Sequence, residues 1–295
     1  MKTLTRDHIV YSLDKTHPPA LTVDPGETIL LETHDARTGT IRSDSDLLDK
    51  PHPLGANPAT GPIFVNSAEP GDTLAVEILD IKLADSCYVA SKAQIGLLAQ
   101  RAERFATRVM PIRDGSIYFN EQIRLPSRPM IGVIGVAPVG VGIATGDVGI
   151  HGGNMDNRYI TTGATLYLPV LVAGALLGIG DIHAAMGDGE ISMVGVEVAA
   201  QVTVRVQLLK NMPCARPWLE NANEWVTTGD HVEPAQACRI AAEEMTNLLE
   251  GKLGVSFDEA YMLMSGWGDV QICQMCEPNI SFTTARAVFP RPRST

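Results

Sequence analysis

The sequence lacks the basic clusters and the long apolar runs that mark two large classes of proteins. Its formal net charge is −11, and its largest basic cluster is one Arg-Pro-Arg near the C-terminus, which is too small for the phosphate contacts of a nucleic-acid-binding protein. Its most apolar run, residues 165–179, is interrupted by Pro169, Gly174 and Gly178 and is too short to cross a bilayer. We therefore expect neither a nucleic-acid partner nor a membrane span.

A secretion signal and an even set of cysteines are also missing. The first twenty residues contain no apolar segment and no small-residue cleavage site, both of which a signal peptide has. The cysteines are odd in number, so they cannot all pair within the chain: Cys87, Cys214, Cys238, Cys273 and Cys276. These features favour free thiols and the reducing cytoplasm.

The motifs of several common enzyme classes are absent as well. The glycines of residues 140–146 do not have the spacing of a dinucleotide-binding loop, and no βαβ pattern surrounds them. Ser265 is followed by glycine but does not lie in a GxSxG nucleophile elbow. Cys273 and Cys276 have a metal-like spacing without a second pair, so we interpret them as core thiols on a strand.

Most of the chain has the pattern of β-strands. Its 295 residues suffice for one domain over residues 1–295, or for two subdomains in close contact. Apolar and polar residues alternate in residues 71–81 and 201–209, and residues 25–36 have the same pattern after a Pro-Gly turn. Residues 43–62 predict a long loop, and the eight glycines of residues 131–153 predict turns and close backbone approach.

Helices are expected only late in the chain. Residues 234–251 begin with proline, end with glycine and carry apolar side chains at the helical period. A second helix follows Ser256, which forms a capping-box pair with Glu259. A mainly β (α+β) fold with late helices fits this order better than alternating βαβ units.

Four ionisable residues lie close together in residues 180–190: Asp181, His183, Asp188 and Glu190. The uncharged residues 165–179 before them predict two strands with a turn near Ala173 and Gly174. On the second strand, alternate residues share a face, so Asp181 and His183 should point the same way as the apolar residues before them.

This spacing predicts a metal site. Buried carboxylates are costly unless they are paired or bind a metal, and residues 180–190 contain no Lys or Arg. Mixed histidine and carboxylate ligands suit Zn²⁺, with an open position if the site is catalytic. A solvated acidic turn after a core strand is the alternative, and spacing alone does not decide between the two.

Two further segments carry candidate residues. His151, Asn154 and Asp156 form the segment HGGNMD, whose glycines permit a close approach to a ligand, although a glycine-rich turn is the simpler interpretation. His34 and Asp35 lie at the end of the strand in residues 25–36 and should face opposite sides. A strand end followed by a polar turn explains them equally well.

In four segments the sequence resembles the acetamidase/formamidase family. They occur in the family's order and together cover nearly the whole chain: NPATGPIFVNSAEPGDTLAVEI, HGGNMD, TLYLPVLVAGALLGIGDIHAAMGDGE and AYMLMSGWGDVQICQ. The resemblance implies a jelly-roll-like β-sandwich with an added α/β portion. It also implies a metal-dependent hydrolase, usually with zinc, that converts short amides to carboxylic acid and ammonia.

The chain departs from the family pattern at two places. Asn157, Arg158 and Tyr159 stand where many relatives have an acidic or lysine-containing tract, and Ser192 and Met193 stand where small residues or cysteine are common. These differences bear on the identity of the substrate more than on the chemistry.

The resemblance turns the candidate residues into a hypothesis about a zinc site. Asp181 and His183 hold the metal, together with Asp35 or His34 from a neighbouring strand, and the metal activates a water molecule. Glu190 is the general base and then the general acid toward the amide nitrogen.

The segment HGGNMD supplies the remaining roles of this hypothesis. His151 and Asn154 orient the substrate or stabilise the oxyanion, and Asp156 holds His151. Which carboxylate binds the metal and which acts as the base stays open.

Two alternatives to a linear-amide hydrolase remain. The same scaffold fits a γ-lactamase, which hydrolyses a cyclic amide, and it fits a non-enzymatic protein that binds a small molecule or metal. In each case the expected ligand is small. We expect a homodimer or a higher homo-oligomer, because closed two-fold assemblies are the commonest.

Overall fold

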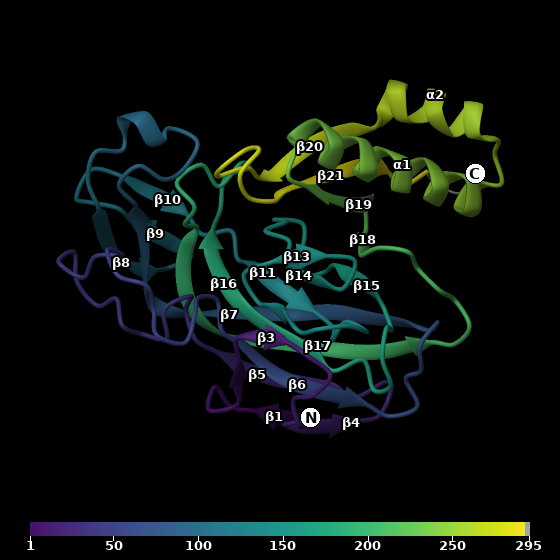
Figure 1. The fold of residues 1–295 in the computed structure, drawn as a ribbon, viewed down its shortest axis with the longest axis horizontal. Coiled ribbons are helices and arrows are strands. Elements are labelled where there is room, and N and C mark those ends of the chain that lie inside the picture. The colour runs from purple at the N-terminus through teal and green to yellow at the C-terminus, as the bar shows by residue number, and fades with distance from the viewer. Residues whose placement is uncertain (293–295) are drawn as a thin grey trace.

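The computed structural model describes residues 1–292, which form one large curled β-sheet and two helices near the C-terminus (Figure 1). Arg293, the last residue of the basic cluster, lies outside the described residues. Nineteen strands belong to the large sheet, while β3 and β12 form a two-stranded sheet of their own.

The strands follow one another along the chain with few helical interruptions. In the first half they are β1 (Lys2–Leu4), β2 (Ile9–Val10), β3 (Ser12–Leu13), β4 (Leu21–Val23), β5 (Thr28–Thr33), β6 (Ala59–Val65), β7 (Thr73–Ser91), β8 (Ala106–Arg113), β9 (Ser116–Tyr118), β10 (Arg124–Pro126) and β11 (Met130–Gly135). In the second half they are β12 (Ile143–Ala144), β13 (Val148–Gly149), β14 (Gly152–Asn154), β15 (Thr165–Pro169), β16 (Leu177–Ala185), β17 (Val196–Leu209), β18 (Trp218–Glu220), β19 (Glu224–His231), β20 (Asp269–Gln274) and β21 (Thr283–Pro290).

The two longest strands, β7 and β17, run antiparallel through the body of the sheet. Their pairing extends from Glu197 opposite Tyr88 to Leu209 opposite Thr73. The predicted alternation is confirmed, since the apolar residues expected on one face of each strand are all buried in the main core: Leu74, Val76, Ile78, Val202, Val204 and Val206. Removing these side chains from water is the main force that holds the curled sheet together.

Strand β16 lies in the interior of this sheet and positions the candidate residues. It pairs with β11, β17 and β6, and all its residues except Ala185 are buried. The uncharged residues 165–179 form β15 and the start of β16, as the two-strand interpretation predicts. These two strands do not pair with each other, because β15 pairs with β7 and β18. Because the apolar part of β16 anchors it in the core, its polar end is held in the core as well.

The loop predictions are only partly right. Residues 43–58 are irregular, but β6 begins at Ala59, inside the expected loop. Residues 131–153 contain strands, because their glycines let β11 and β14 approach each other closely. A Cβ atom on Gly135 would lie 2.6 Å from the backbone nitrogen of Gly153. The expected close approach is present, therefore, but within paired strands.

Both expected helices are present. Helix α1 (Pro234–Leu253) ends two residues later than predicted, where Gly254 adopts a left-handed φ of 67° that glycine tolerates. Helix α2 (Phe257–Trp267) begins with the predicted capping box between Ser256 and Glu259.

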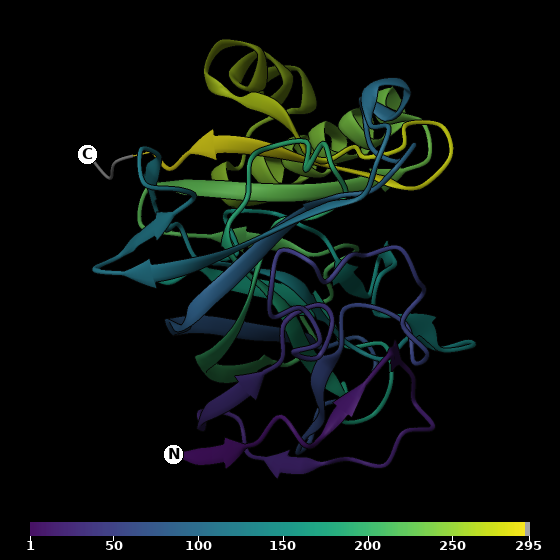
Figure 2. The same cartoon turned by 90° about the vertical axis from the view of Figure 1, so that its left-hand side faces the viewer.

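The helices cover one face of the C-terminal strands. They lie on the side of β19, β20 and β21 that faces away from the rest of the molecule (Figure 2). A second core cluster fills the space beneath them, with Ala237, Ala241 and Met245 of α1 packed against Ala285 and Ala287 of β21. These elements form the α/β portion of a mainly β, sandwich-like fold with late helices, which confirms the predicted fold class.

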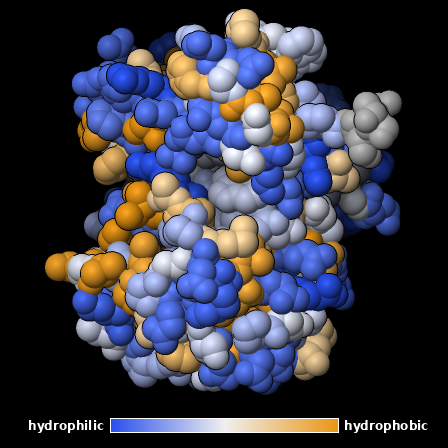
Figure 3. All heavy atoms as spheres, turned by 90° about the vertical axis from the view of Figure 1, so that its right-hand side faces the viewer, coloured by the Kyte–Doolittle hydropathy of each residue, from blue (hydrophilic) through white to orange (hydrophobic). Residues whose placement is uncertain are grey.

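The surface is mixed in character. Hydrophilic residues cover much of the face shown in Figure 3, with small groups of apolar residues among them near the top and at the left of the middle. Among residues 1–292, no helix is long and apolar enough to cross a membrane. All five cysteines are free.

Candidate functional site

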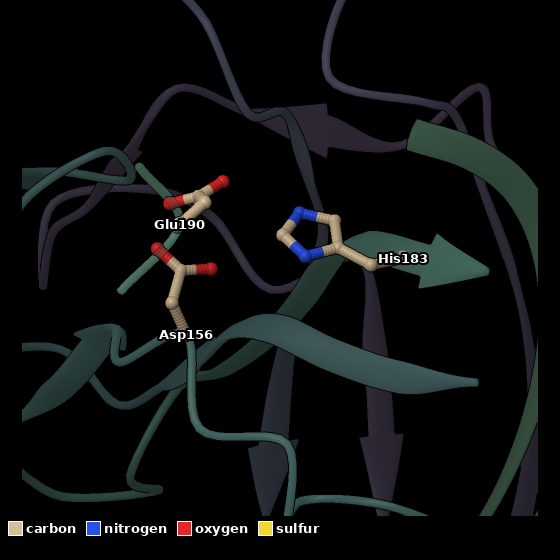
Figure 4. Close-up of side chains that lie close together, drawn as sticks. All are labelled: Asp156, His183 and Glu190. Atoms are coloured by element: carbon tan, nitrogen blue, oxygen red, sulfur yellow. The ribbon is translucent and has the colours of Figure 1, made fainter. Parts of the chain in front are cut away.

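Five ionisable side chains meet in the interior beside β16. Strand β16 supplies Asp181 and His183, the loop after it supplies Glu190, β17 supplies Glu197, and the segment after β14 supplies Asp156. Their possible ligand atoms form two groups, Asp156–His183–Glu190 and Asp181–His183–Glu197, each with its atoms within 4.8 Å of one another. Figure 4 shows the first group, in which the imidazole points toward two adjacent carboxylates. His183 belongs to both groups.

His183 lies between the two carboxylates of the second group. Its Nε2 is 3.6 Å from Asp181 Oδ2 and 3.5 Å from Glu197 Oε2, and the three side chains are 1%, 2% and 5% exposed. Glu197 is the direct cross-strand neighbour of His183 in the β16–β17 ladder, an arrangement that brings side chains close. Asp181 has a left-handed φ of 54°, a costly conformation that occurs preferentially at functional sites.

Several atoms of this cluster have no hydrogen-bond partner among residues 1–292. They are Asp156 Oδ1, Asp181 Oδ1, Glu197 Oε2 and both ring nitrogens of His183. A buried carboxylate without a partner is strongly destabilising, and here several of them surround one imidazole. A divalent cation would satisfy these atoms together, and the mixture of carboxylate oxygen and imidazole nitrogen fits zinc.

The electrostatics of the cluster reflect this crowding. Burial raises the pKa of Asp156, Glu190 and Glu197, and the negative charges of neighbouring carboxylates raise each pKa further. Burial lowers the pKa of His183, but Glu197 and Asp181 outweigh it and raise the pKa well above its ordinary value. The site therefore favours either extra protons or a bound cation in place of free negative charge.

Two glycines leave space for the cluster. A Cβ atom on Gly195 would lie 2.5 Å from His183 Nδ1, and one on Gly132 would lie 2.8 Å from both Asp156 Oδ1 and Asp181 Oδ2. Real Cβ atoms do not approach other heavy atoms so closely. A larger residue at either position would therefore move the ionisable side chains.

The cluster faces a pocket of about 440 Å³, which is large enough for a small molecule. Asp181, Glu190 and Glu197 line it together with residues from distant segments: Asn57, Lys92, Asn154, Met193, Gln274 and Phe282. Met193 is one of the residues at which the sequence differs from the pattern of the family it resembles, and it lines this pocket.

Amide side chains order one wall of this pocket. Asn57 Nδ2 donates to Asn154 Oδ1 at 3.4 Å, which leaves the Nδ2 group of Asn154 available to another acceptor. Gln274 Nε2 donates to Asp156 Oδ2 at 3.2 Å. Asn154 therefore presents an amide group to the pocket.

The structure does not bring His34 or Asp35 into either ligand group. The chain turns directly after β5, and Asp35 Oδ1 accepts hydrogen bonds from the backbone nitrogens of Arg37 and Gly39 at 2.8 and 3.1 Å. Asp35 thus has the turn-capping role of the alternative interpretation. Burial lowers the pKa of His34, which lies beside Arg6.

His151 lies apart from Asp156, contrary to the expected support of one by the other. Both ring nitrogens of His151 have no hydrogen-bond partner among residues 1–292, whereas Asp156 contacts Gln274 and Glu190. Strand β14 separates the two in the chain and turns Asp156 toward the cluster. His151 is fully buried, which lowers its pKa to about 4, so its imidazole is neutral near pH 7.

Asp188 is an ion-pair residue and belongs to neither ligand group. Its Oδ2 lies 2.5 Å from Arg286 Nη2 and 3.2 Å from Arg158 Nη2. The absence of Lys and Arg from residues 180–190 is therefore misleading for Asp188, since Arg286 reaches it from β21.

Three site residues were not among the sequence candidates. Glu197 and Gln274 lie on strands, and their roles depend on which strands are neighbours. Cys276 is buried, as a core thiol should be, but its Sγ lies 3.1 Å from the backbone oxygen of Glu190 and 3.8 Å from Glu190 Oε2. The only sequence signal for Glu197 is an acidic residue at the start of an otherwise apolar alternation.

Comparison with known proteins gives consistent matches. The sequence model of the Acetamidase/Formamidase family matches residues 10–141 and 142–285. The crystal structure of an acetamidase from Bacillus halodurans is similar with a TM-score of 0.94 and 37% identity, over 98% of this chain and 97% of that one. A predicted acetamidase/formamidase from Thermoanaerobacter tengcongensis has a TM-score of 0.93 and 39% identity, over 98% of this chain and 95% of that one.

A curated relative is longer than this chain. A Schizosaccharomyces pombe protein with formamidase in its name is 28% identical, and the match covers 66% of this chain and 62% of that protein. The match thus spans about three-fifths of the length of the yeast protein.

Proposed function

Because the chain belongs to the acetamidase/formamidase family, we propose that it hydrolyses the carbon–nitrogen bond of short linear amides. Formamide and acetamide represent the substrate class, and the products are a carboxylic acid and ammonia. The observation that carries this proposal is the cluster of buried carboxylates around His183 at the base of a pocket of about 440 Å³.

The proposal includes a divalent cation, with zinc as the expected ion. Asp181, His183 and Glu197 would hold it, because they are almost wholly buried and retain unpartnered atoms. Glu197 takes the position that the sequence hypothesis gave to His34 or Asp35. When bound, such an ion supplies a Lewis acid and lowers the pKa of water toward neutrality.

Glu190 is the proposed general base. It lines the pocket and lies beside the ligand residues, and burial raises its pKa, which makes the carboxylate a stronger proton acceptor. The Glu190 carboxylate takes a proton from the attacking water as the water oxygen bonds to the amide carbon. It then returns this proton to the nitrogen as the carbon–nitrogen bond breaks.

Asn154 is the proposed orienting residue. Its bond to Asn57 fixes the amide group, so that Nδ2 can donate to the substrate and stabilise developing charge. His151 does not line the pocket in the described residues, and we therefore assign it no contact with the substrate.

Ammonia release tests the proposed function. Purified protein should release ammonia from formamide or acetamide, lose this activity on chelation and regain it with added zinc. A γ-lactam in the same panel separates a cyclic-amide hydrolase from a linear-amide hydrolase. If the zinc-loaded protein releases no ammonia from any amide, the non-enzymatic alternative is favoured. Full activity with less than about a tenth of an equivalent of metal would show that the reaction does not need a metal.

We retain two further expectations as part of this proposal. A homodimer remains the default assembly, and size-exclusion chromatography with light scattering measures it. A cytoplasmic location is the expected one, since the five free thiols suit a reducing compartment, and cell fractionation tests it.

A further inference from the structure

Lys92 is the one cationic residue that lines the pocket within the described part of the chain. It follows the last residue of β7 and shares the pocket with four acidic residues: Asp147, Asp181, Glu190 and Glu197. Its side chain is partly buried, and its Nζ lies 3.8 Å from the sulfur of Met193.

The ammonium of Lys92 has an unused capacity for hydrogen bonds. Among residues 1–292, no carboxylate oxygen lies within 4.0 Å of its Nζ, although eleven other ion pairs are present in the protein. A thioether sulfur is only a weak acceptor, and an ammonium has three donors. Partial burial without an anionic partner is unfavourable, so an anionic oxygen in the pocket would be bound strongly.

Backbone hydrogen bonds order the loop that follows Lys92. The backbone nitrogen of Leu97 donates to the oxygen of Ile191 at 2.8 Å, and that of Gln94 donates to the oxygen of Ala102 at 2.7 Å. The segment that carries Lys92 is thereby joined to the segment that follows Glu190. A donor held in place before the reaction stabilises developing charge better than a mobile one.

We propose that Lys92 binds the acyl oxygen of the substrate. Its ammonium donates to the amide carbonyl oxygen, to the same oxygen as it becomes negative after water attacks, and to the carboxylate product. This inference rests on the proposed amide hydrolysis. The need for it is electrostatic, because four acidic side chains line the pocket, and the Lys92 ammonium adds a positive charge to that of the proposed ion.

The test compares Lys92→Met with Lys82→Met. Methionine keeps the length of the side chain without its charge, and Lys82 lies on β7, the strand that precedes Lys92, but is exposed. We expect Lys92→Met to lower kcat/KM for acetamide about 100-fold, the usual effect of removing an oxyanion donor. Lys92→Arg should restore part of the loss, and Lys92→Gln serves as a second neutral variant if the methionine variant does not fold.

Acetate binding gives a readout that does not depend on turnover. The binding of sodium acetate to the zinc-loaded proteins is measured by calorimetry. The dissociation constant should be at least about tenfold higher for Lys92→Met than for the wild type and Lys82→Met, because a charge-assisted hydrogen bond is lost. Zinc content should stay equal in all variants.

The outcomes separate this inference from the proposed function. If the wild type releases ammonia and Lys92→Met matches it in both kcat/KM and acetate affinity, the role of Lys92 is wrong and amide hydrolysis stands. If no amide is hydrolysed, the proposed function fails. In that case, weaker acetate binding by Lys92→Met still supports an anion site at Lys92, and equal binding overturns it.

Discussion

Replacing Glu190 by glutamine removes one negative charge and the proposed proton acceptor while the shape of the side chain is kept. Its neighbours can remain in place, because Cys276 contacts the backbone oxygen of residue 190 at 3.1 Å and Gln274 binds Asp156. The proposed metal ligands Asp181, His183 and Glu197 are unchanged. We therefore expect the zinc content of Glu190→Gln to stay near that of the wild type.

The expected loss of activity follows from the geometry. General acid–base catalysis contributes about 10²–10⁴-fold. Asp156 lies beside Glu190 in the same ligand group and can take up part of its role. The loss in kcat should therefore be about 10²–10³-fold, which corresponds to about 3–4 kcal/mol in the activation free energy.

The assay is steady-state ammonia release from acetamide, with zinc measured on the same sample by elemental analysis. Glu103→Gln is the matched control, because Glu103 is exposed and does not line the pocket. A fully active Glu190→Gln protein would refute the assignment of the base. Loss of zinc from this variant would instead make Glu190 a ligand.

Three further changes test the site from other directions. Glu197→Gln should weaken zinc binding by at least about tenfold and lower activity in zinc-limited buffer, whereas unchanged zinc affinity would remove Glu197 from the ligand set. Gly195→Ala should lower activity because its Cβ would lie 2.5 Å from His183 Nδ1. The control Gly187→Ala should have little effect, because a Cβ atom there meets nothing within 4 Å. Equal kinetics of the two variants would contradict the packing argument. Because burial lowers the pKa of His151 to about 4, its contribution to the free energy of unfolding is complete above pH 6.5 and decreases as the pH falls toward 4, by about 3 kcal/mol. In urea unfolding, the free energy of unfolding of His151→Gln should depend less on pH between 6.5 and 4 than that of the wild type. An unchanged pH dependence would show that His151 is not its cause.

The sequence predicts strands and helices better than it predicts their neighbours. The alternation in β7 and β17 and the capping box of α2 are local patterns, and they correspond to the structure. The pairing of β15 with β7 and β18 instead of β16 depends on contacts between distant segments, for which a single sequence has no local signal.

In the candidate site, too, the sequence predicts what is local on one strand but not which strands are neighbours. Asp181 and His183 could be paired from their spacing on one strand. Glu197 could not, since it becomes the neighbour of His183 only through the register of β16 and β17. Asp188 was grouped with these residues because the local sequence contains no partner for it. Its partner Arg286 comes from β21, nearly one hundred residues away.

The proposed reaction centre and the pocket walls come from different parts of the chain. All five side chains of the two ligand groups fall within residues 156–197, whereas Asn57, Lys92, Gln274 and Phe282 reach the pocket from segments before and after that stretch. Substitutions in those outer segments can therefore reshape the space for the acyl group without altering the metal ligands. A descendant of this chain could acquire a new amide substrate by drift at wall positions such as Asn57 and Phe282, while one short, uninterrupted piece of sequence preserved the proposed metal ligands and the general base.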